Sequence, residues 1–222
     1  MPIEIIGSTG YELDTDAAGA AKMVVRPTDA TGFGHYTYGG FTGILPAALA
    51  ANSEIFQFRW ADATRVCIIN EIMISACVTT TFFAAGVPVQ IDLVKSTGWT
   101  VAGTLGTAIS PAALLKKRTS MSSSLMASGD ARIATTAALG VGTKTLETLA
   151  LATLLAPGPI TASLNGQIIP AGTTLYRGEI AHGQHPLVLA QNEGFSIRSV
   201  AVPATGTWQA AISVDWTESA NY

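Results

Sequence analysis

A regular alternation over residues 208–216 constrains the fold of this chain more than any other feature. Every second residue of this run has an apolar side chain, while the residues between them are mostly small or polar. The set is Trp208, Ala210, Ile212, Val214 and Trp216. Side chains of a β-strand point alternately to the two faces of a sheet, so this run predicts a strand with one apolar face.

Several other segments also predict strands. Phe56, Phe58 and Trp60 share one parity within residues 54–60, and residues 87–95 alternate in the same way. Residues 66–81 are rich in Ile, Val and Thr and predict one long strand that is buried on both faces. Further strands are expected at residues 3–6, 22–26, 173–180 and 195–202.

Strands gathered toward both ends of the sequence predict an all-β fold, an antiparallel jelly-roll or Greek-key β-sandwich in which early and late strands pair. We expect residues 53–222 to form this sandwich. Residues 98–170 show no clear period and are interpreted as an elaborated central insertion, with a short helix at residues 111–118.

Residues 1–52 are interpreted as an extended N-terminal arm. They are rich in glycine, alanine and threonine and carry no sustained period, so the arm gains little from its own contacts when it is ordered. Its aromatic residues Phe33, Tyr36, Tyr38 and Phe41 are predicted to anchor it to a neighbouring subunit or to the surface of a larger assembly.

A shortage of charge indicates an assembly. Only 12% of the 222 residues are charged and 48% are hydrophobic, whereas soluble domains usually carry about 25% charged residues. Such a chain is expected to cover part of its surface with copies of itself, as a homotrimer or another cyclic oligomer. The net charge of −3 offers no basic field for a nucleic acid.

The two cysteines predict free thiols. Cys67 and Cys77 have the same parity within one expected strand, so they should share a face. Ten residues of strand span roughly 33 Å, far beyond the separation of about 7 Å that a disulfide tolerates. Both thiols are therefore expected to be free and buried.

No motif in the chain indicates catalysis or a cofactor. There is no Gly-x-Ser-x-Gly elbow, and the segment 140–145 lacks the adjacent Gly-Lys of a phosphate-binding loop. Glu179, His182 and His185 could supply ligands to a divalent metal, but surface or interface histidines are the simpler interpretation. The sequence therefore predicts a protein that is not an enzyme and holds no metal or cofactor.

The one basic cluster, formed by Lys116, Lys117 and Arg118, allows two interpretations. It could cap and solvate the end of the expected helix, or it could contact an acidic partner surface. Membrane association is not expected, because the apolar run at residues 149–160 is interrupted by prolines and is too short to span a bilayer. The first residues lack the pattern of a signal peptide.

Five short segments resemble virion structural proteins of tailed bacteriophages. They are Phe58-Arg-Trp60 with Ala61-Asp62, Arg132–Leu139 leading to Gly142–Leu146, Gln191–Arg198, Gly206-Thr-Trp208, and Asp215–Glu218. The resemblance is spread over about residues 54–222, and residues 1–53 carry none of it.

This resemblance implies a capsid decoration (cement) protein with a jelly-roll body, made in the bacterial cytoplasm and assembled into the virion. Its partners would be its own copies and the major capsid protein. A tail, baseplate or receptor-binding subunit is the alternative, with Trp99 or residues 33–41 as an exposed sugar site. A polysaccharide depolymerase is a weaker alternative.

Overall fold

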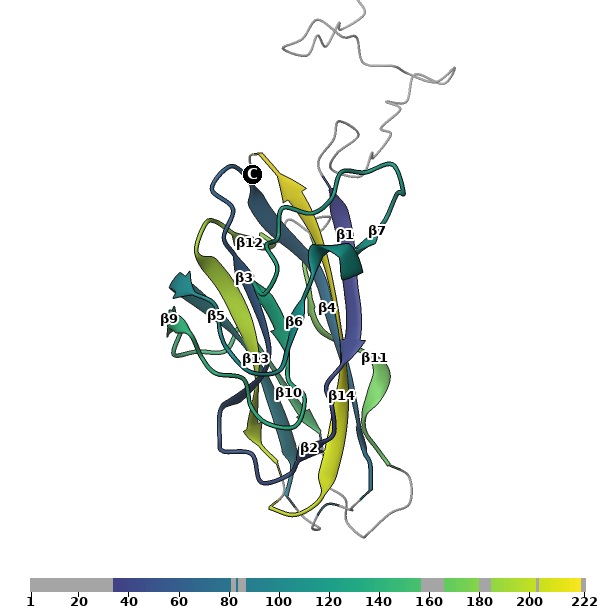
Figure 1. Ribbon diagram of the computed structural model, residues 1–222. Helices are drawn as coiled ribbons and strands as arrows, with labels where there is room; N and C mark the ends of the chain where they lie inside the picture. The colour runs from purple at the N-terminus through teal and green to yellow at the C-terminus, as the bar shows by residue number, and fades with distance from the viewer. Residues whose placement is uncertain are drawn as a thin grey trace, which may run out of the picture. The chain divides into compact units, whose positions relative to one another are not determined.

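The computed structural model is a β-sandwich of two antiparallel sheets (Figure 1). It describes residues 34–80, 83, 87–156, 166–179, 185–202 and 204–220, all within one compact unit that spans Gly32–Tyr222. These residues contain no α-helix, and a 3₁₀ turn, η1 (Pro111–Ala113), stands where a short helix was expected. The predicted β-sandwich is confirmed, while the jelly-roll connection of its strands stays a prediction.

Sheet 1 has the strand order β11-β4-β14-β1-β7, with β12 beside β4 and β2 beside β14. Its strands are β1 (His35–Phe41), β2 (Leu45–Pro46), β4 (Val66–Val78), β7 (Leu115–Lys116), β11 (Gln167–Arg177), β12 (Leu187–Leu189) and β14 (Thr207–Ser219).

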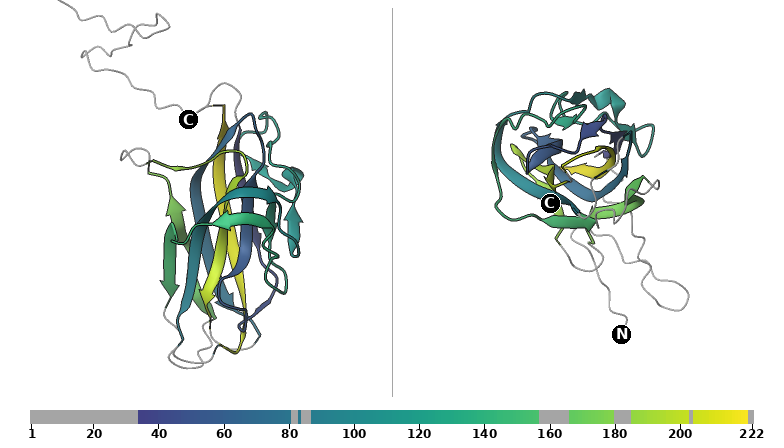
Figure 2. Two further views of the ribbon diagram at one scale, coloured as in Figure 1. Left: turned by 90° about the vertical axis from the view of Figure 1, so that its left-hand side faces the viewer. Right: turned by 90° about the horizontal axis from the view of Figure 1, so that it is seen from below.

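Sheet 2 has the order β10-β5-β13-β3-β8-β6, with β9 beside β5. Its strands are β3 (Ser53–Trp60), β5 (Val89–Val101), β6 (Thr107–Ile109), β8 (Ala131–Ile133), β9 (Thr143–Leu146), β10 (Ala152–Ala156) and β13 (Glu193–Ala201). Figure 2 shows the two layers from the side and from below.

Early and late strands pair, as the sequence predicts. The first described strand, β1, pairs along its whole length with the last strand, β14, and β3 pairs with β13. The expected insertion is part of the sandwich, because β6 and β10 form the two edges of sheet 2 and β7 forms one edge of sheet 1.

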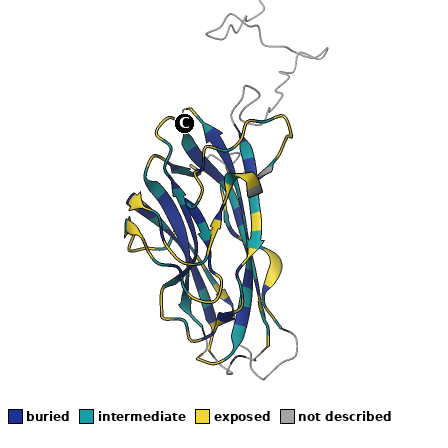
Figure 3. Ribbon diagram, in the orientation of Figure 1, coloured by how far each residue is buried: buried dark blue, intermediate teal, exposed yellow. Residues whose placement is uncertain are grey.

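Aromatic side chains join the two sheets. Phe58 of sheet 2 meets Trp216 of sheet 1 edge-on at 5.2 Å between ring centroids, and it stacks on Phe195 at 5.3 Å. Trp60 and Trp208 are also fully buried, which confirms that these tryptophans belong to the core. Buried residues, dark blue in Figure 3, run along the central strands of both sheets.

The predicted boundary of the arm needs correction. Tyr36 and Tyr38, predicted to anchor a neighbouring subunit, lie on the inner face of β1: Tyr36 is buried in the core and Tyr38 stacks on Phe56. The glycines responsible for the wrong interpretation make room for these rings. A Cβ on Gly34 would collide with the Tyr36 ring, and one on Gly40 with the Tyr38 ring. The sandwich therefore begins near residue 34, and residues 1–33 of the predicted arm, Phe33 among them, lie outside the described residues.

A β-bulge in β4 changes the face on which its residues lie. Ile69 is opposite Trp216 and Glu71 is opposite Asp215, so Asn70 is an extra residue in β4. Before the bulge the odd-numbered residues of β4 face the core, and after it the even-numbered ones do.

The bulge separates the two thiols. Both cysteines are free, as predicted, and Cys67 is buried, but Cys77 is exposed on the opposite face. The expectation of a shared buried face is wrong, because it assumed an uninterrupted strand with a period of two.

The place of β1 in the core predicts different effects for two aromatic residues of the same strand. Tyr36→Ala should lower the free energy of unfolding by roughly 3–5 kcal/mol, as removal of a buried aromatic ring does. Phe41, which is 71% exposed on the other face, is the control, and Phe41→Ala should change the stability of the dissociated monomer by less than about 0.5 kcal/mol. Urea unfolding of the two variants measures the difference, and equal effects would contradict the position of β1.

Candidate functional site

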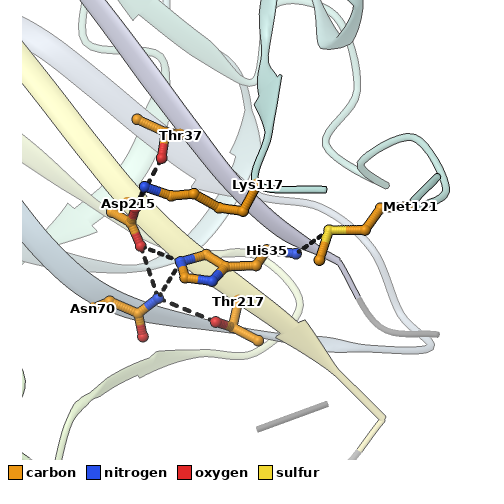
Figure 4. A network of polar contacts seen from close by, with 7 residues as sticks. All are labelled: His35, Thr37, Asn70, Lys117, Met121, Asp215 and Thr217. Carbon is orange, nitrogen blue, oxygen red and sulfur yellow. Dashed lines mark hydrogen bonds and ion pairs between the residues drawn. The ribbon is translucent and has the colours of Figure 1, made fainter. Parts of the chain in front are cut away.

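A network of polar side chains lies on the outer face of sheet 1, next to the bulge. It gathers residues from β1, β14, β4 and the segment after β7, and Figure 4 shows them converging on one carboxylate. Bulges commonly redirect a side chain toward a site. Here the bulge presents Asn70 to Asp215 of the neighbouring strand.

The Asp215 carboxylate is surrounded by donors. Oδ1 contacts His35 Nε2 at 2.5 Å and accepts from Asn70 Nδ2 at 2.9 Å. Oδ2 accepts from Thr37 Oγ1 at 2.7 Å and forms an ion pair with Lys117 Nζ at 2.7 Å. The network continues through Asn70, which also donates to Thr217 Oγ1 at 3.1 Å.

These contacts hold Asp215 in its ionised form. Burial by itself would raise the pKa of this carboxyl, but hydrogen bonds from His35, Lys117, Asn70 and Thr37 outweigh burial and hold the pKa well below its usual range. A carboxylate occupied by four donors is a poor general base. We therefore interpret the network as a polar clamp that fastens the segment after β7 to β14 and β1.

The predicted basic cluster is partly used within this clamp. Lys117 pairs with Asp215, and Lys116 Nζ donates to the Met121 carbonyl oxygen at 3.0 Å. Arg118 is exposed. The structure thus brings Lys117, itself partly exposed, into the network, whereas Arg118 lies on the surface.

Phe41 is the predicted anchor that faces solvent. It projects from the outer face of sheet 1 between two shallow grooves of about 310 and 220 Å³, and it lines both of them. Their other lining residues are mostly small or apolar and include Gly39, Ser75, Cys77 and Ala211. No charged side chain lines either groove within the part of the chain that the structure describes.

A third hollow, of about 350 Å³, lies beside β5, β12 and β13. Its walls carry an ion pair between Lys95 and Glu147 at 3.2 Å, together with Glu193 and Tyr176. Trp99, suggested as an exposed sugar platform, is fully buried under other side chains instead. The suggestion that Trp99 forms an exposed sugar site is therefore wrong.

Among the described ranges, no three His, Cys, Asp or Glu side chains gather in a way that could hold a metal ion. Of the suggested metal ligands, Glu179 and His185 are described, whereas His182 lies outside the described residues. Within the same ranges no helix is long and apolar enough to cross a membrane.

Comparison with known proteins yields no relative. No protein-family model, curated protein or solved structure matches the chain. The functional argument therefore depends on the residues and their geometry.

The polar clamp predicts a pH-dependent effect of Asp215→Asn. The folded-state pKa of Asp215 is depressed. Its contribution to folding stability is therefore complete above the unfolded pKa of about 3.9, and it is lost as the pH falls toward the lower folded pKa. At pH 7 the free energy of unfolding of the variant should be about 2 kcal/mol lower than that of the wild type.

Denaturant unfolding at pH 7 and pH 3 checks this prediction, and the difference between the two proteins should shrink at pH 3. Arg118→Ala, which changes an exposed residue of the same basic cluster, should leave stability nearly unchanged at both pH values. A difference between wild type and Asp215→Asn that stays constant over this range would contradict the assigned role.

Proposed function

We propose that this protein is a structural subunit of a tailed-bacteriophage virion, a capsid decoration (cement) protein that acts through its surfaces. The observation that carries the proposal is the uncharged region of the outer face of sheet 1 around Phe41, which projects from it with 71% of its surface exposed. The resemblance of residues 54–222 to virion structural proteins supplies the biological setting.

The chemistry of this face favours a protein partner. Exposed apolar surface of this kind usually marks an interaction site on a soluble protein. Small residues on both sides of Phe41 allow a neighbouring sheet or loop to come close, and the grooves beside Phe41 are wide enough for an apolar side chain. The absence of charge from the described lining residues removes a large desolvation cost.

We propose a second copy of this chain as the occupant of the face. In a cyclic oligomer such as the predicted homotrimer, Phe41 of one copy would lie in a groove beside Phe41 of the next. Other exposed residues, among them Leu149 at 80% and Leu155 at 62%, remain for contacts with the major capsid protein.

A cement function requires no chemistry. Many copies would bridge neighbouring capsid subunits and oppose the outward pressure of packaged DNA, so each contact could be weak while the shell gains from all of them. A tail, baseplate or receptor-binding subunit is the alternative location, and it would use the same association of copies. The burial of Trp99 removes one feature that had favoured the receptor-binding alternative.

Location in particles and association of copies test the proposal together. Purified virions should contain the protein at the head, and the isolated wild-type protein should form a defined oligomer by light scattering. Phe41→Asp should give a folded monomer that fails to enter particles, because it buries a charge in an uncharged contact.

Val101→Asp is the matched control, since it places the same charge at an exposed apolar residue of sheet 2. It should retain the oligomer. Detection of the protein only at the tail of purified virions would favour the alternative location. Absence of the protein from virions would overturn the proposal. A wild-type protein that stays monomeric at micromolar concentration would contradict the association of copies.

A further inference from the structure

A buried group of polar side chains lies on the face of sheet 2 that points away from the aromatic core. Glu54 and Gln57 come from β3, Ser196 from the adjacent strand β13, and Lys144 from β9. The side chains of Lys144 and Glu54 are only 2% and 1% exposed. A lysine this deeply buried is uncommon, and it needs a specific explanation.

One oxygen of Glu54 joins the group. Oε2 contacts Lys144 Nζ at 2.5 Å and accepts from Gln57 Nε2 and from Ser196 Oγ, each at 2.7 Å. Lys144 Nζ also lies 3.0 Å from Ser196 Oγ and 3.9 Å from the centroid of the Trp99 ring. The amine of Lys144 and the amide of Gln57 therefore meet at a single carboxylate oxygen.

The orientation of the Gln57 amide is determined by its neighbours. Nε2 faces two acceptors, the Glu54 carboxylate and the Gly140 carbonyl oxygen at 3.1 Å. The reverse orientation would place oxygen against oxygen. The carbonyl oxygen Oε1 points to Gly103, where a Cβ would come within 2.0 Å of it, so this glycine provides the room that the amide needs.

Two oxygen atoms of this group have no hydrogen-bond partner. Glu54 Oε1 and Gln57 Oε1 are both buried and unpaired, and an unpaired buried polar atom is costly. If the proton of Lys144 moved to Oε2 of Glu54, which Nζ contacts, the buried ion pair would become a neutral pair. The same transfer would leave a neutral amine beside the amide.

We propose that Lys144 and Gln57 become joined by an isopeptide bond within the folded chain, with Glu54 carrying the protons. The geometry supplies each participant: a buried amine, an amide held in one orientation and a carboxylate that contacts both. Correct placement of reacting groups in a fold replaces a bimolecular encounter and accelerates such a step greatly.

The reaction balances without an external reagent. Nζ gives one proton to Glu54 and attacks Cδ of Gln57, so the Nζ–Cδ bond forms and the Cδ–Nε2 bond breaks. Glu54 passes the proton to Nε2, which leaves as ammonia. The second proton that Nζ releases departs with it as ammonium, and Glu54 is again a carboxylate.

The electrostatics agree with this role for Lys144. Burial lowers the pKa of Lys144, and this effect is larger than the opposite effect of the hydrogen bond and negative charge of Glu54. Desolvated lysines are the ones that act as nucleophiles in proteins. The bond would fix the segment that contains β9 across the outer face of sheet 2, and this inference does not depend on association through sheet 1.

Intact-mass spectrometry of the full-length protein tests the proposal. The wild type should weigh less than its sequence mass by one ammonia, and a proteolytic digest should yield a branched peptide that joins Gln57 to Lys144. Lys144→Arg keeps the positive charge but lacks the amine, so it should have its full sequence mass.

Glu54→Gln is the decisive variant, since both reacting partners remain while the proton carrier is lost, and it should also keep its full mass. Thr145→Ala, at an exposed residue of β9 next to Lys144, is the control that retains all three participants, and it should still form the bond. A wild type that keeps its full mass after prolonged incubation, with no branched peptide, would overturn the proposal and leave a buried ion pair. Bond formation in Glu54→Gln to the wild-type extent would overturn the role of Glu54.

Discussion

The contact of Phe58 with Trp216, supported by the stacking of Phe58 on Phe195, is the interaction on which the rest of the structure depends. It joins a strand near the start of the described chain to the last strand. Burial of these rings supplies a large part of the apolar surface that must offset the ordering of two sheets. It also fixes which face of β14 points inward, and therefore places Asp215 on the outer face of sheet 1.

The two outer faces of the sandwich differ in how they are covered. On sheet 2 the segment that contains β9 lies over β3 and β13 and encloses Glu54, Gln57 and Lys144. On sheet 1 the Asp215 network occupies one region, while the region around Phe41 is open and uncharged among its described lining residues. A sandwich with one self-covered face and one open face suits a subunit that assembles through a single side. This difference is the structural basis of the proposed function.

Sequence patterns predict the parts of this fold that depend on period alone. The alternation through Trp208 and Trp216 correctly predicts β14 and its inner face, because β14 contains no extra residue. The same reasoning fails for Cys77, since it assumed an unbroken period of two, whereas the bulge at Asn70 shifts the period of β4 by one residue. It fails for Tyr36 because Gly34 was interpreted as flexible, whereas it provides space for a ring. The Asp215 network and the group around Lys144 unite residues far apart in the chain, so no local spacing could indicate them.

Reaction of the two thiols with a small reagent tests most directly the claim that sheet 1 has one buried face and one face that packs against copies. Cys67 is buried in the core, and Cys77 is exposed in a groove beside Phe41. The account predicts that Cys77 alone reacts in dilute native protein, that its rate falls as concentration promotes association, and that Cys67 reacts only after unfolding. Equal reaction of both thiols in the native state, or a Cys77 rate that does not change with protein concentration, would contradict it.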